Sequence, residues 1–311
     1  MVTQMITASN IDHHASIPTP LQEIHHELLA EKQVRLWVKR DDLIHASING
    51  NKWRKLKYNL LNAQANQHDV LLSFGGAYSN HIYALASAGA IFGFKTIGII
   101  RGELTKPLNA TLQHAQNCGM QLHFINRQQY RHKEQLDFIQ QLHQQFGRFY
   151  LLPEGGSNQL ALPGCREISQ EITKQIDCDR YTICTPVGSG GTLAGLSLNT
   201  SHQPTILGFA VLKNAGFLNA NVSHLLAEHP QHNPWQINLD YHFGGYAKVT
   251  HDLTHFVTEF TKQTKIPLEP IYSGKMFYGI FDLIKHNFFP KGDTIVALHT
   301  GGLQSDRRNT K

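Results

Sequence analysis

The sequence predicts an α/β protein with open, twisted, mostly parallel sheets, and three observations lead to that class. Short runs rich in β-branched residues alternate with longer stretches of helical periodicity along most of the chain. Such alternation requires crossover connections, which make neighbouring strands parallel and place helices on both faces of a sheet. The chain has 311 residues, more than one ordinary core, so we expect two domains.

The expected elements follow one another in that alternating pattern. Strands are predicted at 34–39, 70–74, 96–100, 122–125, 182–187, 206–211 and 294–299. Helices are predicted at 53–65, 80–92, 106–117, 133–146, 159–176, 192–198, 252–264 and 275–287.

Three of the predicted strand-to-helix turns are unusually rich in glycine and small polar residues. They span 75–81, 155–158 and 188–192. In open parallel sheets, ligands bind beyond the carboxyl ends of the strands, where a strand turns into a helix. We therefore expect the functional site at these turns.

The third turn has the composition of a phosphate-binding loop. It consists of Gly188, Ser189, Gly190, Gly191 and Thr192. Glycines let backbone N–H groups turn toward an anion, and the start of a helix adds partial positive charge. The loop lacks the Gly-Lys-Ser/Thr of a Walker motif and the downstream acid of a dinucleotide site, which favours a smaller phosphate ligand. A glycine-rich turn without a ligand remains the alternative for this loop taken alone.

Lys52 opens a predicted helix and has three interpretations. It could be a solvated surface lysine or part of a nucleic-acid patch, although the basic run carries no aromatic ladder apart from Trp53. It could instead be a nucleophile whose pKa is lowered by the helix start and by the crowding of Arg54 and Lys55. The context of further motifs decides between them.

Those motifs occur in a fixed order and together resemble one enzyme group. They are Arg40-Asp41-Asp42, Asn49-Gly50-Asn51-Lys52-x-Arg54-Lys55, Phe74-Gly75-Gly76-x-x-Ser79-Asn80-His81, the 188–192 loop, Tyr272-x-Gly274-Lys275 and His299-Thr300-Gly301-Gly302. Jointly they resemble the D-cysteine desulfhydrase and 1-aminocyclopropane-1-carboxylate (ACC) deaminase group of fold-type-II, tryptophan synthase β-like, pyridoxal-phosphate enzymes. The resemblance covers residues 36–302.

The resemblance implies how pyridoxal 5'-phosphate would be bound. Lys52 would bind the cofactor covalently, Asn80 would bond its ring hydroxyl, and Thr300 would face its ring nitrogen. The phosphate would be held by Lys55, Gly188, Ser189, Gly190, Gly191 and Thr192.

The resemblance also implies which residues would act on a small amino-acid substrate. Ser79, Asn80 and His81 would bind the substrate carboxylate at a helix start, and Ser79 would also act in catalysis. Tyr272 and Tyr246 are candidate acids or bases. The alternatives are an ordinary N-cap for Ser79 and ordinary packing for the tyrosines.

Two positions favour one activity within the group. Deaminase members have Glu and Leu where this chain has Ser273 and Thr300. A carboxylate at the ring nitrogen would deepen the electron sink, whereas a hydroxyl cannot. We therefore expect D-cysteine desulfhydrase-like α,β-elimination to pyruvate, ammonia and hydrogen sulfide. The alternatives are an ACC deaminase, which forms 2-oxobutanoate and ammonia, and a non-catalytic cofactor-binding protein on the same scaffold.

The resemblance and the composition set the remaining expectations. A large cofactor-binding domain is predicted from 1–52 and 153–311, a small domain from 53–152, and a homodimer by analogy. The net charge of +5 is scattered, so we expect no nucleic-acid partner. The longest apolar stretch, 82–94, is too short to span a membrane, which takes about 20 residues.

Localisation and metal binding follow from what the sequence lacks. The first 31 residues contain no Lys or Arg for a signal peptide, and the four cysteines form no C-x-x-C pair, which predicts a cytoplasmic protein. His26-Glu27 lacks the second histidine of a zinc-protease helix, so no metal is expected. The polar tail 306–311 stands where relatives continue into a closing segment, so we expect altered packing beneath Thr300.

Overall fold

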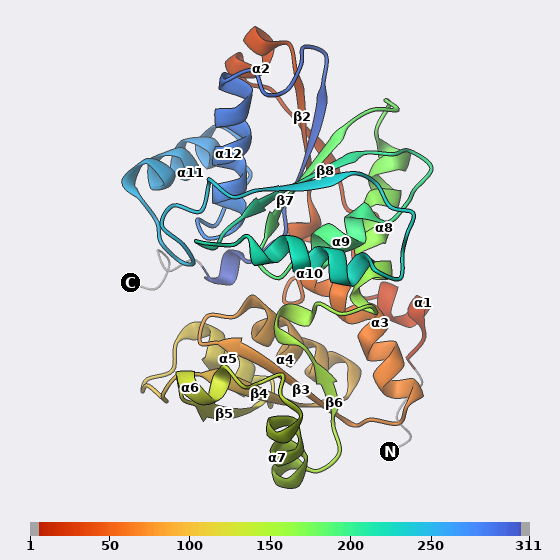
Figure 1. Cartoon of the computed structure of the whole chain (residues 1–311), viewed down its shortest axis with the longest axis vertical. Helices are drawn as coiled ribbons and strands as arrows, with labels where there is room; N and C mark the ends of the chain where they lie inside the picture. The colour runs from red at the N-terminus through yellow and green to blue at the C-terminus, as the bar shows by residue number, and fades with distance from the viewer. Residues whose placement is uncertain (1–5, 306–311) are drawn as a thin grey trace.

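The computed structural model describes residues 6–305, which form two sheets that lie one above the other in Figure 1. The large sheet has the strand order β1-β2-β10-β7-β8-β9, and the small sheet has the order β5-β4-β3-β6. All neighbouring strands are parallel except β1 and β2. The predicted α/β class with mostly parallel sheets is confirmed.

The strands agree with the prediction in the centre of each sheet and differ at the edges. Their bounds are β1 Leu21–Ile24, β2 Arg35–Lys39, β3 Val70–Gly76, β4 Lys95–Arg101, β5 Gln121–Ile125, β6 Tyr150–Leu152, β7 Thr182–Val187, β8 Thr205–Ala210, β9 Trp235–Asn238 and β10 Thr294–Leu298. Strands β1, β6 and β9 were not predicted. Each lies at an edge of its sheet and has three or four residues, too few for a clear alternating pattern.

The helices were predicted where they are long and were missed where they are short, and α10 is the one longer helix that was missed among the described residues. Their bounds are α1 Ala8–Asp12, α2 Glu27–Lys32, α3 Asn51–Ala65, α4 Asn80–Phe92, α5 Ala110–Asn117, α6 Arg127–Tyr130, α7 Leu136–Phe146, α8 Ala161–Gln175, α9 Gly191–Ser197, α10 Phe217–Leu226, α11 His251–Thr264 and α12 Ser273–Lys285. Short 3-10 turns are η1 Asp41–Leu43, η2 Glu154–Gly156 and η3 Leu303–Ser305. Helices α1, α2, α6 and α10 were not predicted. The first three have six residues or fewer, and α10 has no side-chain cap at its start.

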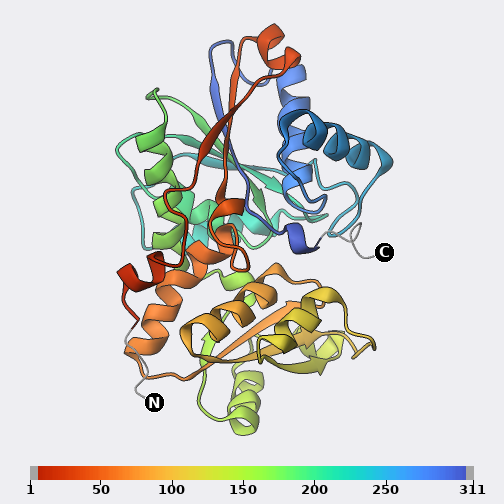
Figure 2. The same ribbon diagram turned by 180° about the vertical axis from the view of Figure 1, so that it is seen from behind.

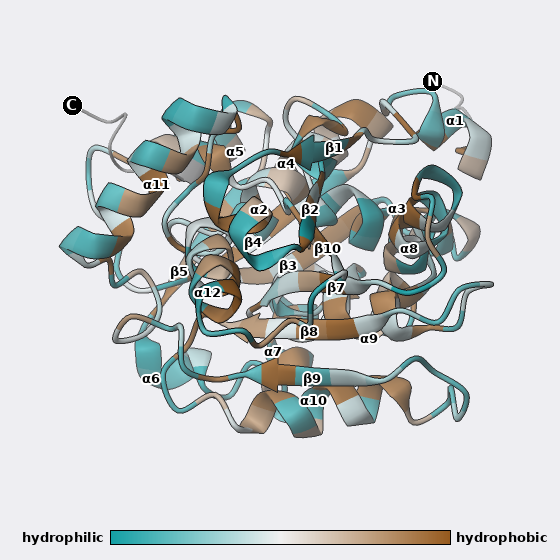
Figure 3. Ribbon diagram, turned by 90° about the horizontal axis from the view of Figure 1, so that it is seen from above, coloured by the Kyte–Doolittle hydropathy of each residue, from teal (hydrophilic) through white to brown (hydrophobic). Residues whose placement is uncertain are grey.

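Helices cover both faces of each sheet. Apolar side chains of α2, α11 and α12 pack on one face of the large sheet, and those of α8, α9 and α10 pack on the other. On the small sheet, α1, α3, α4 and α5 cover one face, and α6 and α7 the other. Figure 3 shows α11 with both teal and brown turns, as expected of a helix with one buried face.

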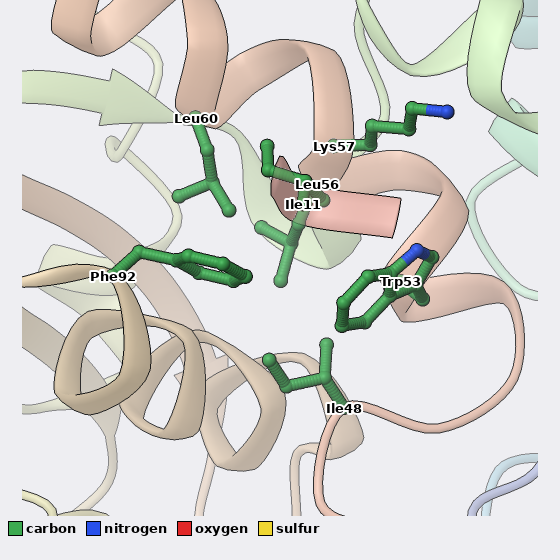
Figure 4. A pocket seen from close by; sticks show the side chains of 7 residues that line it. All are labelled: Ile11, Ile48, Trp53, Leu56, Lys57, Leu60 and Phe92. Atoms are coloured by element: carbon green, nitrogen blue, oxygen red, sulfur yellow. The ribbon is translucent and has the colours of Figure 1, made fainter. Parts of the chain in front are cut away.

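The chain passes between the two sheets twice, through α3 and α8, and these helices pack closely (Figure 2). A Cβ atom on Gly164 of α8 would lie 1.9 Å from the carbonyl oxygen of Arg54 on α3, so only glycine fits there. On its other side, α3 contributes Trp53, Leu56 and Leu60 to an apolar cluster with α1 and α4, shown in Figure 4. The predicted domain bounds remain a prediction, because α3 packs against elements of both sheets.

Two findings concern the membrane and the chain ends. Among residues 6–305, no helix combines the length and the hydropathy that a membrane crossing requires. The described residues exclude the first five residues and the polar tail 306–311. The expectation of no signal peptide rests partly on the former, and the expectation about packing beneath Thr300 rests on the latter.

Candidate active site

Lys52 is the second residue of α3, and its helix starts against the end of β10. The preceding Gly50 has φ +61°, and a Cβ atom there would lie 1.7 Å from the carbonyl oxygen of Thr300. This close approach, which only glycine allows, brings the start of α3 and the 299–302 segment together. The sequence motifs that contain Lys52 and Thr300 are therefore neighbours in space.

The amine of Lys52 is easier to deprotonate than an ordinary lysine. Desolvation by burial, and then the positive charge of Lys55 one turn along the helix, lower the pKa of Lys52 to about 7. No hydrogen bond to the Lys52 amine is formed within the described part of the chain. At pH 7 about half of the Lys52 amines are neutral. A neutral amine without a hydrogen-bond partner is suited to attack an aldehyde.

The predicted crowding of Lys52 by Arg54 is wrong. The buried Arg54 guanidinium is on another side of α3, where it donates two hydrogen bonds to Asp41, both of 3.1 Å. It also binds Glu171 in bidentate fashion, at 2.7 and 3.0 Å. Lys39 donates to the same Glu171 carboxylate at 2.7 Å. Sequence adjacency misled the prediction, because successive helical residues point about 100° apart.

Lys55 connects two of the three glycine-rich turns. Its Nζ donates to the carbonyl oxygen of Gly155 at 3.2 Å, to Ser157 Oγ at 2.9 Å and to Ser189 Oγ at 3.4 Å. The two serine hydroxyls are 2.7 Å apart. Burial lowers the pKa of Lys55. Ser157 has no role in the sequence-based site, although its turn was singled out, and the structure places it with the predicted phosphate ligands.

The glycines of the 188–192 loop let neighbouring side chains approach its backbone closely. A Cβ atom on Gly191 would lie 2.5 Å from Ser157 Oγ, and one on Gly188 would lie 3.2 Å from the ring of Tyr272. At the far side of the loop, Thr192 Oγ1 accepts a hydrogen bond of 2.8 Å from Asn51 of α3. The loop, α3 and Tyr272 therefore surround one small region.

Ser79 and Asn80 lie at the start of α4. Ser79 is the N-cap, with its hydroxyl accepting from the backbone N–H of Ile82 at 3.2 Å, so the N-cap alternative describes its geometry. Asn80 Oδ1 accepts from Gln304 Nε2 at 3.1 Å, and a Cβ atom on Gly302 would lie 2.6 Å from Asn80 Nδ2. Asn80 thus lies between the small sheet and the 299–302 segment.

The His81 ring points into the protein, toward the turn at Gly156. Its Nε2 is 2.9 Å from Ser73 Oγ, which itself donates to the carbonyl oxygen of Leu152 at 2.9 Å. Because the hydroxyl proton is used there, Nε2 carries the ring proton and Nδ1 is an acceptor. Burial and the nearby Lys52 and Lys55 hold the pKa of His81 well below its usual range. A neutral ring in this tautomer has no free N–H for a carboxylate.

Tyr272 and Tyr246 meet at the edge of the site. Their rings are 6.1 Å apart and their side chains are hydrogen-bonded. Tyr272 packs on Gly188, whereas Tyr246 is 41% exposed. Burial, and then Tyr246, raise the pKa of Tyr272 well above its ordinary value. The Tyr272 hydroxyl therefore keeps its proton and can donate a hydrogen bond.

Glu269, a buried carboxylate close to Tyr272, was not among the predicted site residues. Glu269 accepts from the backbone N–H groups of Ile271 at 2.7 Å, Tyr272 at 2.9 Å and Ser273, and from Ser273 Oγ at 3.0 Å. It holds the turn that leads into α12, and the signal was an acidic residue followed by proline just before a helix. Burial raises the pKa of Glu269 against the effect of these donors.

These residues fit pyridoxal phosphate. Lys55, Ser157 and Ser189 supply donors suited to a phosphate, and glycines keep the neighbouring space free of side chains. A lysine with a pKa of about 7 lies one turn away from Lys55. No group of three or more potential metal-binding side chains occurs within residues 6–305.

Comparisons with known proteins agree with this donor set. The sequence profile of the family described as pyridoxal-phosphate dependent enzymes matches residues 14–301. The chain is 29% identical to a protein named putative 1-aminocyclopropane-1-carboxylate deaminase from Pyrococcus horikoshii, over 92% of this chain and 89% of that protein. It is 31% identical to a mitochondrial protein from Arabidopsis thaliana named bifunctional D-cysteine desulfhydrase/1-aminocyclopropane-1-carboxylate deaminase, over 93% and 77%.

A solved structure shares the fold over most of the chain. It is a crystal structure of an ACC deaminase homologue, 28% identical in sequence, with a TM-score of 0.80. The match covers 92% of this chain and 90% of that one.

Proposed function

The chain belongs to the family of pyridoxal-phosphate-dependent enzymes that includes D-cysteine desulfhydrases and ACC deaminases, and from that premise we propose that it cleaves D-cysteine by α,β-elimination. The α carbon loses a proton and the bond from the β carbon to sulfur breaks. With one water, the products are pyruvate, ammonia and hydrogen sulfide.

The observation that carries the cofactor part of the proposal is the arrangement of Lys52 and Lys55 on α3. One amine has a pKa of about 7 and no partner among the described residues, and the other is fixed by a carbonyl and two serine hydroxyls. We assign the first to the aldehyde of the cofactor. We assign the second, with Ser157, Ser189 and the 188–192 backbone, to its phosphate.

The chain's own groups have separate roles in the proposed reaction. Bound pyridoxal phosphate delocalises the electron pair that remains when a substrate loses its α proton. The Lys52 amine, neutral near pH 7, takes that proton. Backbone N–H groups at Ser79 and Asn80 bind the substrate carboxylate, since the start of α4 favours negative charge. Tyr272, whose raised pKa keeps its hydroxyl proton in place, donates a hydrogen bond to the departing sulfur.

The preference for elimination rests on the polar groups that we assign to the ring nitrogen. Thr300 offers a hydroxyl, and the Ser273 hydroxyl is bound to Glu269. The Glu269 carboxylate already accepts hydrogen bonds from the backbone N–H groups of Ile271, Tyr272 and Ser273. Without a free carboxylate the ring is a modest electron sink, which suits a substrate with a good leaving group such as thiolate.

ACC deamination to 2-oxobutanoate and ammonia is the second candidate. It is favoured by the names of the relatives, one a putative ACC deaminase and the other bifunctional. A protein that binds the cofactor without turnover is the third, and the two tests below separate all three.

The first test compares substrates. The purified protein is assayed for keto acid and sulfide with D-cysteine, L-cysteine, β-chloro-D-alanine, D-serine and ACC. We expect pyruvate from D-cysteine and β-chloro-D-alanine, and ACC turnover slower by about tenfold or more, equivalent to about 1.4 kcal/mol in the barrier. Turnover of ACC alone would show that the argument from Ser273 and Thr300 is wrong.

The second test concerns Lys52. Lys52→Ala should abolish the visible absorbance of the covalently bound cofactor and reduce turnover by several orders of magnitude. Lys95→Ala, an exposed lysine at the start of β4, is the matched control and should behave as the wild type. Retained absorbance and turnover in Lys52→Ala would exclude Lys52 as the cofactor lysine.

A further inference from the structure

Lys275, the last residue of the Tyr-x-Gly-Lys motif, is a fully buried lysine in the third position of α12. The proposed chemistry does not use it. Its ammonium donates to three backbone carbonyl oxygens, those of Gly245 at 2.8 Å, His242 at 2.9 Å and Val211 at 3.4 Å. These three bonds use all the donors that a lysine has.

This environment differs from that of the other buried lysines. Lys39 binds the carboxylate of Glu171, and Lys55 binds serine hydroxyls as well as a carbonyl. Around Lys275 the hydrogen-bond acceptors are carbonyl oxygens alone. Burial lowers the pKa of Lys275 to about 8, and the charge of Glu269, which is not among its hydrogen-bond partners, opposes that shift. A cluster of inward-facing carbonyls is the environment that proteins otherwise use for a desolvated monovalent cation.

The carbonyls belong to a loop with an unusual backbone. Within the 242–247 loop, φ is positive at Phe243 (53°), Gly244 (91°), Gly245 (120°) and Ala247 (56°). Positive φ costs about 1 kcal/mol at a residue with a side chain, so such a run persists only when its surroundings hold it. Two residues of α12 hold the loop. Lys275 donates hydrogen bonds to it, and the ring of Tyr278 packs edge-on against that of Phe243, with 4.9 Å between the ring centroids.

The carbonyls that Lys275 binds also organise the loop internally. The His242 oxygen accepts from the N–H of Gly245 at 3.0 Å, and the Gly245 oxygen accepts from the N–H of Lys248 at 3.1 Å. The next residue, Tyr246, reaches Tyr272. The ammonium is therefore the buried centre of the turn that presents Tyr246 to the site.

We propose that Lys275 acts as a built-in monovalent cation that holds the 242–247 loop in place and so positions Tyr246 against Tyr272. It is a positioning residue, since it acts through the loop. The anchoring of the loop is independent of the proposed function, whereas its consequence for turnover rests on that function.

The test measures the loop directly, by chymotrypsin cleavage after the exposed Tyr246 in the full-length protein. Lys275→Met keeps the length of the side chain and removes the buried charge, so it should fold. We expect cleavage after Tyr246 to be faster by about tenfold or more, because local opening is easier. Lys213→Met is the matched control, since Lys213 is exposed and its Cβ lies 3.4 Å from a Cβ atom placed on Gly245. It should be cleaved at the wild-type rate.

A second variant tests the cation itself. Lys275→Ala leaves room for a small ion, so about 100 mM potassium or ammonium chloride should slow the cleavage, compared with tetramethylammonium chloride at the same ionic strength. The wild-type protein should show no such dependence. An unchanged cleavage rate in Lys275→Met, or equal rates of Lys275→Ala in the three salts, would overturn the proposal.

A measurement on the wild type keeps the proposal testable if both variants fail to fold. The amides of Gly245 and Lys248, whose acceptors are bound to Lys275, should exchange with deuterium about 100-fold more slowly than in an unstructured peptide. Exchange at the unstructured rate would overturn the anchoring. Visible cofactor absorbance and keto-acid formation are recorded separately, so a protein that binds no cofactor would fail the proposed function and leave the loop result intact.

Discussion

The most informative single residue is Lys52, because its chemistry depends on the pH at which its amine loses a proton. Burial and Lys55 together lower its pKa from 10.5 to about 7. In the folded protein the neutral amine is therefore half formed near pH 7, whereas an exposed lysine reaches that point more than three pH units higher. The difference is large enough to measure.

We predict that covalent capture of pyridoxal phosphate by the cofactor-free protein follows this titration. The rate should rise through pH 7 and level off above about pH 8, because only the neutral amine attacks the aldehyde. Rapid mixing followed by visible absorbance measures it. With pyridoxal, which has no phosphate, Lys55→Met should shift the midpoint upward, because one positive neighbour is lost. A rate that keeps rising to pH 10 without an inflection contradicts the assignment.

At the residue scale, sequence predicted the identity of site residues better than their orientation. Lys52, Lys55, Ser189 and Thr300 come together because the glycines beside them permit close approach, and those glycines are visible in the motifs. The direction of Arg54 was not predictable, since its partner Glu171 lies 117 residues away. The predicted catalytic and binding roles stay predictions.

At the scale of elements, the site depends on how α3 and α8 are joined. Asp41, Arg54 and Glu171 form a buried ionic cluster, and Arg54 lowers the pKa of Glu171 despite its burial. A lowered carboxyl pKa stabilises the fold above the ordinary value of 4.5 and loses that effect as the pH falls through the lowered value. The cluster therefore predicts sensitivity to acid.

We predict that Arg54→Met lowers the free energy of unfolding at pH 7 by about 3 kcal/mol or more, because the buried Asp41 loses its guanidinium partner and the partly buried Glu171 is left with Lys39. Urea unfolding measures it. The deficit should shrink below pH 4.5, where Glu171, which then has only Lys39 as a cationic partner, takes up a proton more readily than in the wild type. Arg180→Met, at an exposed arginine, should change stability by less than about 0.5 kcal/mol. Equal stability of the two variants would contradict the structural role of Arg54.

The hydrogen bonds that Glu269 accepts before α12 give a second prediction at this scale. Glu269→Ala should destabilise the protein by about 2 kcal/mol, because the backbone N–H groups of Ile271, Tyr272 and Ser273, in the turn that leads into α12, lose their acceptor. Glu269→Gln keeps one acceptor oxygen and should cost less. Urea unfolding compares both with Glu228→Ala, an exposed control. A fully stable Glu269→Ala would show that water replaces the carboxylate.

Central strands and long helices were predictable, whereas of the edge strands only β5 was predicted. Strands such as β7 and β10 have continuous apolar sequences because both of their faces are buried. Edge strands β1 and β9 pair on one side only, and their polar residues carry no strand signal. The role of Glu269 before α12 could have been predicted from the sequence. Its hydrogen bonds with the backbone N–H and the hydroxyl of Ser273 could be found only from the structure.

At the scale of the whole molecule, the site draws on both sheets. The phosphate donors lie at the ends of β6 and β7, Asn80 follows β3, and Lys52 lies on the helix between the sheets. A ligand that binds here connects parts of the molecule that otherwise meet mainly at α3 and α8. Its binding energy should therefore stabilise the entire fold.

We predict that pyridoxal phosphate at about 100 times its dissociation constant stabilises the protein by about 2.7 kcal/mol. Thermal unfolding with and without cofactor should show a clear upward shift of Tm. The shift should be smaller for Lys52→Ala, which retains the phosphate donors. Superimposed unfolding curves for the wild type would contradict a site shared by the two sheets.

Strand order has a consequence for how the protein is made. β10 lies between β2 and β7, so residues 294–298 pair with residues 35–39 across most of the chain length. The small sheet, in contrast, is built from the continuous segment 70–152. As the polypeptide leaves the ribosome, the small sheet can assemble early, while β2 waits without its central partner until translation has passed residue 298. We expect the nascent large sheet to be the part that depends on chaperones.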